Sequence, residues 1–232
     1  MKKSKIEKTI WLIIIMLITT YKVSSQTIIT NSKLVISHTD MILFLQSDTN
    51  TMVSVQTLSY KNFLKIGSVK RKELGDKWFD DTYKGKFKKK YYHKTKRDLG
   101  HLTPFKATSY SLETALNSFS SYNQAPQDYY FNEHTWNEFE QDVLDTISKY
   151  KMSSCIMTGV IYNNNNPTYL PNSKIKIPTY FFKVLFIGDK RYYWIGDNTP
   201  GIDNPIKVTT LEELNKMFID NNMDLRIGLN IK

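Results

Sequence analysis

Between residues 97 and 140 the chain carries side chains of the kinds that hydrolyse phosphate esters. His101 follows a glycine, Asn123 stands in an amide-rich turn, and Asn132 opens a helical pattern that reaches Glu140. Phosphodiester hydrolysis needs an activated water, a cation beside the phosphate and stabilisation of the departing oxygen. The types and order of these residues therefore indicate metal-assisted phosphodiester hydrolysis.

His101 is the candidate general base. A neutral imidazole, with a reference pKa near ~6.5, can accept a proton from water at physiological pH. Gly100 before it allows another part of the chain or a ligand to approach closely. A histidine alone is more often structural, but no other histidine of this chain has a comparable context.

Asn132 is the candidate magnesium ligand. Its amide oxygen is a hard donor, and magnesium keeps several waters when a protein supplies few ligands. The substrate phosphate would then complete the site, and Glu140, two helical turns on, could orient the surrounding waters. Asn132 is also a good helix N-cap, Glu140 alone is an ordinary helix acid and Asn123 alone is a turn residue, so these alternatives stay open.

A basic stretch with interleaved aromatic residues lies directly upstream of His101, in a chain of net charge +10. Such a stretch suits a polyanion, because the release of counterions from phosphates drives binding. A solvated basic surface is the simpler alternative. The basic members are Lys84, Lys86, Lys88, Lys89, Lys90, Lys94, Lys96 and Arg97, and the candidate nucleic-acid contacts among them are Lys88, Lys89, Lys90, Lys94 and Lys96.

The first 25 residues have the pattern of a secretory signal peptide. Lysines precede an apolar run from Ile10 to Ile18, and Val23-Ser24-Ser25 supplies the small residues of a cleavage site. The apolar run is shorter than the ~20 residues of a membrane span. We expect a secreted protein without stable membrane association after cleavage, and the alternative is an uncleaved signal anchor.

Residues 26–232 are expected to form a single α+β domain with a largely antiparallel sheet. Cys155 is the only cysteine, so this domain has no internal disulfide. The best predicted helix spans Asn132 to Tyr150, and a second begins at Thr209 or Thr210 with a capping box. The predicted strands cover residues 34–36, 41–45, 52–58, 154–162, 180–187 and 191–195. Residues 61–92 are expected to be irregular, with a short helix near Lys72 to Phe79.

The motifs resemble the DNA/RNA non-specific endonucleases, the ββα-metal group that includes endonuclease G and bacterial extracellular nucleases. Asp98-Leu99-Gly100-His101 is similar to the family's Asp-Arg-Gly-His motif. Tyr122 to Gln127 is similar to Ser-Asn-X-X-Pro-Gln, and Phe131 to Glu140 is similar to Leu-Asn-X-X-X-Trp-X-X-Leu-Glu. The likeness covers roughly residues 34–220. Weaker matches follow in order at Thr158-Gly159, Ile177-Pro178, Phe182-Lys183-Val184 and Asp197-Asn198-Thr199-Pro200.

This resemblance implies a central antiparallel sheet flanked by helices, with the histidine on a hairpin that faces the metal helix. It implies His101 as the general base, Asn132 as the direct ligand of Mg²⁺ or Mn²⁺, Glu140 as a holder of metal-associated water, and Asn123 as a residue that helps to position the site. It also implies cleavage of DNA and RNA with little sequence preference, leaving 5′-phosphates. Many members of the family are homodimers.

One position departs from the family motif. Leu99 replaces the arginine that is placed to contact the phosphate region, and leucine cannot do so. Arg97 lies two residues earlier on the same face of an extended segment and is expected to substitute for it, while Arg71 is a loose candidate for a second basic residue. The alternatives are a weakened or inactive relative that still binds nucleic acid, and a secreted domain whose partner is a protein or a membrane surface.

Overall fold

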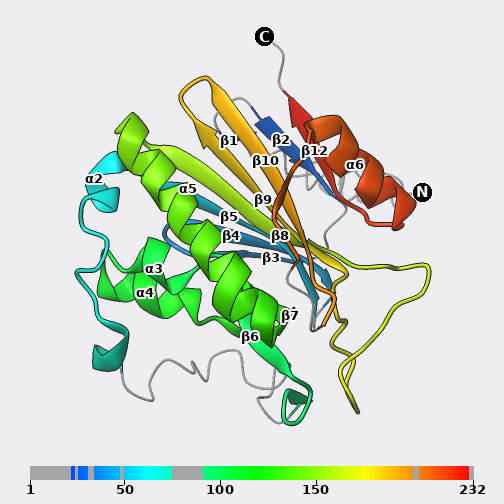
Figure 1. Cartoon of the computed structure of the whole chain (residues 1–232). Helices are drawn as coiled ribbons and strands as arrows, with labels where there is room; N and C mark the ends of the chain where they lie inside the picture. Colours follow the sequence, from blue (N-terminus) through cyan, green and yellow to red (C-terminus); the bar gives the residue numbers. More distant parts are fainter. Residues whose placement is uncertain are drawn as a thin grey trace, which may run out of the picture.

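The computed structural model describes residues 22–23, 26–30, 34–47, 50–74, 91–200 and 204–229 (Figure 1). Residues 1–21, with most of the predicted signal peptide, lie outside this part. Lys88, Lys89 and Lys90 of the basic stretch also lie outside it. Within the described ranges, no helix is long and apolar enough to cross a membrane.

A seven-stranded antiparallel sheet forms the centre of the molecule, with the strand order β11-β10-β9-β8-β5-β4-β3. Six of the strands were predicted within a few residues. Ile187 pairs with Lys190 across a two-residue turn in which Gly188 has a φ of 57°, as tight hairpins require. The strands are β3 (Leu34–Ser37), β4 (Met41–Ser47), β5 (Asn50–Leu58), β8 (Ser154–Ile161), β9 (Tyr180–Ile187), β10 (Lys190–Asp197) and β11 (Lys207–Val208).

Helices pack on both faces of this sheet, which explains why β9 is apolar along nearly its whole length. The ring of Phe181 lies 5.6 Å from that of Trp136, at the start of the long helix that continues as α5 (Asn137–Tyr150). The next residue, Phe182, lies 5.3 Å from Phe218 of α6 (Leu211–Asp220). Successive side chains of a strand point to opposite faces, so the two helices cover opposite sides of the sheet. Figure 1 shows α5 running across the strands.

The predicted capping box at the start of α6 is confirmed. The Thr210 hydroxyl accepts a hydrogen bond from the Glu213 amide, and the Glu213 carboxylate accepts one from the Thr210 amide. Cys155 is buried in β8, and burial raises the pKa of its thiol to about 12. It therefore has the role of a small apolar core residue.

The helix predicted from Asn132 begins three residues earlier, at Tyr129, and contains a π-helical stretch, η6 (Phe131–Trp136), before α5. The carboxylate of Asp128 accepts hydrogen bonds from the amides of Tyr130 and Phe131, at 3.1 and 3.2 Å. The interpretation of Asn132 as the N-cap is therefore wrong, because Asp128 bonds the free amides at this end and Asn132 lies inside the helix.

The π-helical turn also changes how residues align along the helix. In a regular α-helix, eight residues would place Glu140 about 80° around the axis from Asn132. A π-turn, closed by i→i+5 bonds, rotates less per residue and so reduces this offset. The irregular turn brings the two candidate site residues towards the same side of the helix.

A second, two-stranded antiparallel sheet carries His101; the family resemblance implied a hairpin here, whereas the residue pattern predicted neither strand. It pairs β6 (Arg97–His101) with β7 (Gln124–Asp128), so that His101 lies opposite Gln124. The segment between these strands forms α3 (Phe105–Thr108), α4 (Leu112–Ser118) and η5 (Ser121–Asn123).

The remaining elements are short. The chain after β5 forms α2 (Tyr60–Phe63) and a 3-10 helix, η1 (Arg71–Glu73), where a helix near Lys72 was expected; residues 75–79 lie outside the described part. A three-stranded sheet joins β1 (Lys22–Val23), β2 (Gln26–Ile29) and β12 (Arg226–Leu229).

Candidate active site

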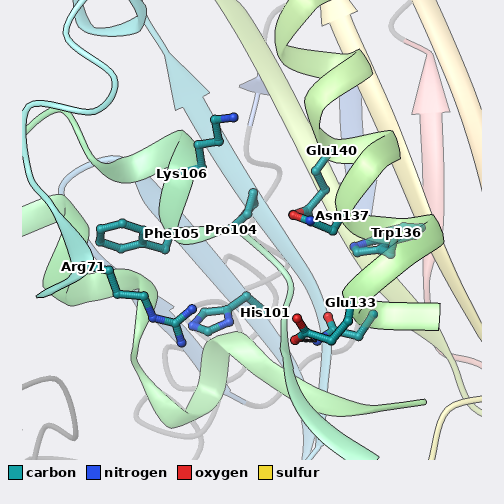
Figure 2. Close-up of a pocket in the computed structure, with 10 residues that line it drawn as sticks. Arg71, His101, Pro104, Phe105, Lys106, Glu133, Trp136, Asn137 and Glu140 are labelled. Atoms are coloured by element: carbon teal, nitrogen blue, oxygen red, sulfur yellow. Dashed lines mark hydrogen bonds between the residues drawn. The ribbon is translucent and has the colours of Figure 1, made fainter. Parts of the chain in front are cut away.

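A pocket of about 270 Å³ lies between the end of β6 and the η6–α5 helix (Figure 2). Three residues predicted from the sequence line it together: His101, Asn132 and Glu140. This confirms that the histidine faces the helix that carries the amide and the carboxylate. The full lining is Arg71, His101, Pro104, Phe105, Lys106, Asn132, Glu133, Trp136, Asn137 and Glu140.

His101 is held as a neutral imidazole. Its ring packs edge-on against Phe119 at 5.1 Å, and its Nε2 atom is buried with no hydrogen-bond partner among the described residues. Burial lowers the pKa of His101 to about 4, and the positive charge of Arg71 contributes in the same direction. A neutral imidazole at physiological pH can accept a proton, as a general base must.

Gly100 allows the two strands under His101 to approach closely. A Cβ atom at this position would collide with the side chain of Gln127, which is fully buried in β7. The close approach of the Gln127 side chain thus explains why a glycine precedes His101. Gln127 is the close neighbour that the sequence analysis expected at Gly100.

The amide of Asn132 is oriented by two carboxylates. Its nitrogen donates to Asp98 Oδ2 at 2.9 Å and to Glu133 Oε1 at 3.2 Å. Both donor contacts of the amide are therefore used by carboxylates, and its oxygen remains as the atom that can bind a cation.

The donor set of the pocket fits an ion that keeps its own waters. No group of three or more His, Cys, Asp or Glu side chains able to hold a metal occurs in the part of the chain that the structure describes. One amide oxygen, with the carboxylates of Glu133 and Glu140 nearby in the lining, suits Mg²⁺, which retains water ligands. A closed structural zinc site would need four protein ligands.

Glu140 forms an ion pair with Lys183, a residue that the sequence analysis did not assign to the site. Lys183 Nζ lies 3.2 Å from Glu140 Oε1 and 5.1 Å from the centre of the Trp136 ring. Burial raises the pKa of Glu140, and the ammonium of Lys183 offsets part of that rise. The available signal was a single lysine inside the otherwise apolar strand at residues 180–187.

Asn123 lies behind the pocket and does not line it. Its side chain is fully buried; it accepts a hydrogen bond from the Thr103 amide at 2.9 Å and donates to the carbonyls of Thr103 and Ser118, both at 2.8 Å. Asn123 therefore fixes the segment that follows His101, which is a positioning role without contact to reacting atoms.

The structure places Arg97 outside the lining of the His101 pocket, where it was expected to replace the motif arginine. It lies four residues before His101, about 13 Å along an extended strand, and its Nη1 donates to the Asn198 carbonyl at 2.8 Å. Arg97 and His101 share one face of the strand, but the distance between them places Arg97 in the lining of a different cavity. Leu99, between them, packs against an apolar cluster that includes Leu170 and Ile175.

Arg71 is the guanidinium that the structure brings to the pocket. Figure 2 shows its side chain directed at the ring of His101, and its Cζ lies 5.5 Å from the centre of the Phe119 ring. The weaker of the two basic candidates from the sequence is therefore the one next to the proposed base.

Only part of the basic stretch can be placed. Lys94 and Lys96 are exposed just before β6, with φ values of 62° and 55°. They lie outside the lining of the His101 pocket. A role in binding nucleic acid remains a prediction for them and for Lys88, Lys89 and Lys90.

Comparison with known proteins points in the same direction as the pocket. The sequence profile of the DNA/RNA non-specific endonuclease family matches residues 19–225. The fold is similar to a chain in the crystal structure of the EndoG/EndoGI complex, which addresses the mechanism of EndoG inhibition. The TM-score is 0.62 at 20% identity, over 81% of this chain and 86% of that chain. A comparison with curated proteins found no match.

Proposed function

The chain belongs to the DNA/RNA non-specific endonuclease family, a family of hydrolases, and on that premise we propose that it is a secreted, magnesium-dependent endonuclease. It would hydrolyse phosphodiester bonds of DNA and RNA with little sequence specificity. The observation that carries this proposal is the shared pocket of a neutral His101, the oriented amide of Asn132 and the guanidinium of Arg71.

In this proposal His101 removes a proton from the water that attacks phosphorus. The new P–O bond forms as the bond to the leaving oxygen breaks, and the leaving oxygen takes up a proton from solvent. Arg71 can bind two phosphate oxygens through its planar guanidinium and stabilise the charge that builds up on them. It can therefore supply the contact that Leu99 cannot make.

Asn132 would hold Mg²⁺, or Mn²⁺ in its place, through the amide oxygen. The bound ion supplies positive charge beside the phosphate. Glu133 and Glu140 would accept hydrogen bonds from the waters around it, and Asp98 keeps the amide in the required orientation. Lys183 favours the charged form of the Glu140 carboxylate.

Secretion is proposed from the signal-peptide pattern, with cleavage after residue 25 and residues 26–232 as the mature single domain. Sequencing the N-terminus of the protein recovered from culture medium tests this directly. A protein that stays with the membrane fraction and retains its first 25 residues would support the signal anchor instead. Sedimentation of the mature protein would decide between a monomer and the homodimer common in the family.

The test of activity is cleavage of plasmid DNA and of RNA, with magnesium and with a chelator. His101→Ala should lower the rate by about 10²–10⁴-fold, as expected for loss of a general base. His93→Ala is the matched control, because His93 is exposed and lies outside the pocket lining. Retention of more than about a tenth of the activity by His101→Ala would contradict the assignment.

A second candidate function is a weakened or inactive relative that binds nucleic acid, and Leu99 is the observation that favours it. In that case the wild-type protein would bind DNA with strong salt dependence but would not cleave it at any magnesium concentration. The same plasmid assay, with binding measured in parallel, separates the two functions.

A further inference from the structure

A second, larger cavity of about 820 Å³ lies at the start of β6, where Arg97 and Asp98 line it. Its volume falls within the ~300–1,000 Å³ range of small-molecule sites. Its lining combines three tyrosines with two cations and two carboxylates: Tyr92, Lys96, Arg97, Asp98, Asp128, Tyr129, Tyr130 and Pro200.

We propose that this cavity binds a nucleobase of the substrate strand, next to the phosphate that is cleaved. The inference rests on the proposed nuclease function and adds a substrate class to it: single-stranded DNA or RNA, in which a base is free to leave the helix. Of its described lining residues, only Asp98, which orients Asn132, also belongs to the proposed active site.

The two exposed tyrosines are suitable surfaces for base stacking. Tyr129 and Tyr130 keep 55% and 44% of their surface exposed. Their backbones are fixed, because the Tyr129 amide donates to the Lys96 carbonyl at 3.2 Å and the Tyr130 amide to Asp128 Oδ1 at 3.1 Å. The Tyr130 ring also lies 4.5 Å from that of His134, one helical turn on. Aromatic rings held in place in this way stack on any base.

The buried tyrosine of the cavity has an unused polar group. Tyr92 is only 8% exposed, and its hydroxyl has no hydrogen-bond partner among the described residues. A buried hydroxyl without a partner is unfavourable, and most such groups in native proteins are satisfied. Because this hydroxyl has no exposed surface, it lies inside the wall of the cavity, and Tyr92 contributes ring surface and no polar group to the lining.

Charge favours a base over a phosphate as the occupant. Among the described lining residues, Lys96 and Arg97 are balanced by Asp98 and Asp128, so these residues bring no net positive charge to hold a phosphate group. Arg97 is already engaged by the Asn198 carbonyl. A neutral, flat and polar-edged ligand fits this combination of rings and balanced charges.

The cavity and the active site share one residue, Asp98. It lines the cavity, and its Oδ2 atom accepts the hydrogen bond that orients Asn132. A nucleotide with its base in the cavity would therefore have its phosphate close to the Asn132 pocket. Paired bases of a duplex cannot enter, so the inference predicts a preference for single strands, without discrimination between deoxyribose and ribose.

The experiment measures binding of a short, fluorescein-labelled oligothymidylate to the full chain by fluorescence anisotropy, in chelator so that nothing is cleaved. Tyr130→Ala should weaken binding about ten-fold, and Tyr130→Phe should not. Tyr169→Ala is the matched control, because Tyr169 is 45% exposed and does not line the cavity. Tyr92→Phe, which removes only the enclosed hydroxyl, should leave both the fold and the binding of the oligonucleotide unchanged.

An abasic site in the probe completes the test. If the base occupies the cavity, one abasic position will weaken binding to the wild type and will make Tyr130→Ala neutral on that probe. Unchanged affinity of Tyr130→Ala for the intact single strand, or an equal loss on a duplex of the same sequence, would overturn the inference. If a protein with that binding result still cleaves plasmid DNA, the inference about the cavity fails and the proposed function stands. If binding depends on the base but no DNA is cleaved, the proposed function fails and the inference about the cavity stands.

Discussion

Lys183 and Glu140 form a nearly buried ion pair at the wall of the His101 pocket, with Nζ 3.2 Å from Oε1. The lysine side chain is 1% exposed and the glutamate 17%. Burial alone would favour the uncharged form of each group: it raises the pKa of Glu140 and lowers that of Lys183, and each partner opposes the shift of the other. The ammonium of Lys183 thus favours the charged carboxylate at the place where waters around a cation would need an acceptor.

Replacing Lys183 by methionine should destabilise the protein and alter the pH dependence of cleavage. Removal of one partner of a buried pair leaves an uncompensated charge, which costs about 3–5 kcal/mol. The pKa of Glu140 should rise further without the ammonium of Lys183. The acid limb of kcat/KM should therefore lie at higher pH than in the wild type. Urea unfolding and the pH profile of kcat/KM measure the two effects.

The double variant Lys183→Met with Glu140→Gln is the control for this prediction. It should be more stable than Lys183→Met alone, because no unpaired carboxylate remains buried. If the losses of unfolding free energy from the two substitutions simply add in the double variant, the two side chains do not interact. An unshifted pH profile of Lys183→Met would show that Lys183 has only a structural role.

Cleavage should persist well below the pH at which an ordinary histidine becomes protonated. Burial and Arg71 lower the pKa of His101 to about 4, so the base stays neutral as the pH falls through 6.5. The acid limb of kcat/KM, which reports the free enzyme, is expected near pH 4 to 5. An acid limb centred near pH 6.5 would contradict a buried base.

The same pKa shift predicts how stability changes with pH. The unfolded chain takes up a proton at His101 near pH 6.5, whereas the folded chain does so only near pH 4. The free energy of unfolding should therefore fall by at most about 3 kcal/mol from this group as the pH decreases across that interval. Urea unfolding at several pH values should show a smaller decrease for His101→Gln than for the wild type.

Asn123→Ala should reduce activity through stability and loop position. Three buried hydrogen bonds are lost, and the Thr103 and Ser118 carbonyls would be left without this partner. We expect a loss of about 2–4 kcal/mol in unfolding free energy. The magnesium concentration for half-maximal cleavage should not change, since Asn123 lies outside the pocket. A stable variant with altered magnesium dependence would instead show that Asn123 acts on the metal.

The main sheet and both principal helices were predictable because their patterns are strong. Strand β9 combines β-branched and aromatic residues over eight positions, and α6 has a capping box that can be read from Thr210 and Glu213 alone. The pairing of β6 with β7 could not be predicted from the sequence pattern in this way. Gly100 and Pro126 lower the strand propensity of both segments, and their pairing is fixed by tertiary contacts such as Gly100 against Gln127.

Residues of the candidate site could be predicted where they belong to a sequence motif. They could not be predicted where the three-dimensional arrangement of distant segments brings them to the pocket. His101, Asn132 and Glu140 were found from their spacing. The choice between Arg71 and Arg97 depends on a three-dimensional approach that no local pattern encodes, since Arg71 is thirty residues from His101. In the sequence Lys183 belongs only to the weak match at Phe182-Lys183-Val184, and no local pattern shows that this lysine is buried and has Glu140 as its partner.

Asn132→Ala should raise the magnesium concentration required for cleavage and lower the maximal rate. Stability should fall by only about 1 kcal/mol, because Asp128 and not Asn132 caps the helix. Titration of the cleavage rate with magnesium, beside urea unfolding, measures both quantities. Asn137→Ala is the matched control: it removes an exposed amide from the same helix and pocket. A variant that loses only stability would show that Asn132 has no part in metal binding.

This chain lacks the motif arginine, and Arg71 is the residue proposed to take its role. Arg71→Ala should lower the cleavage rate by about 10²–10³-fold at saturating magnesium, as expected for loss of a charge-stabilising contact. Arg97→Ala should act mainly on stability, through its bond to the Asn198 carbonyl.

Restoring the motif by Leu99→Arg should not activate the enzyme. Leu99 packs against the cluster of Tyr92, Leu170 and Ile175, so a guanidinium placed there would either be buried without a partner or displace these side chains. We therefore expect a less stable protein whose rate per folded molecule is no higher than that of the wild type. A rate increase for Leu99→Arg together with a mild effect of Arg71→Ala would show that the motif position still faces the substrate. In that case Arg71 would not be the group that stabilises the phosphate.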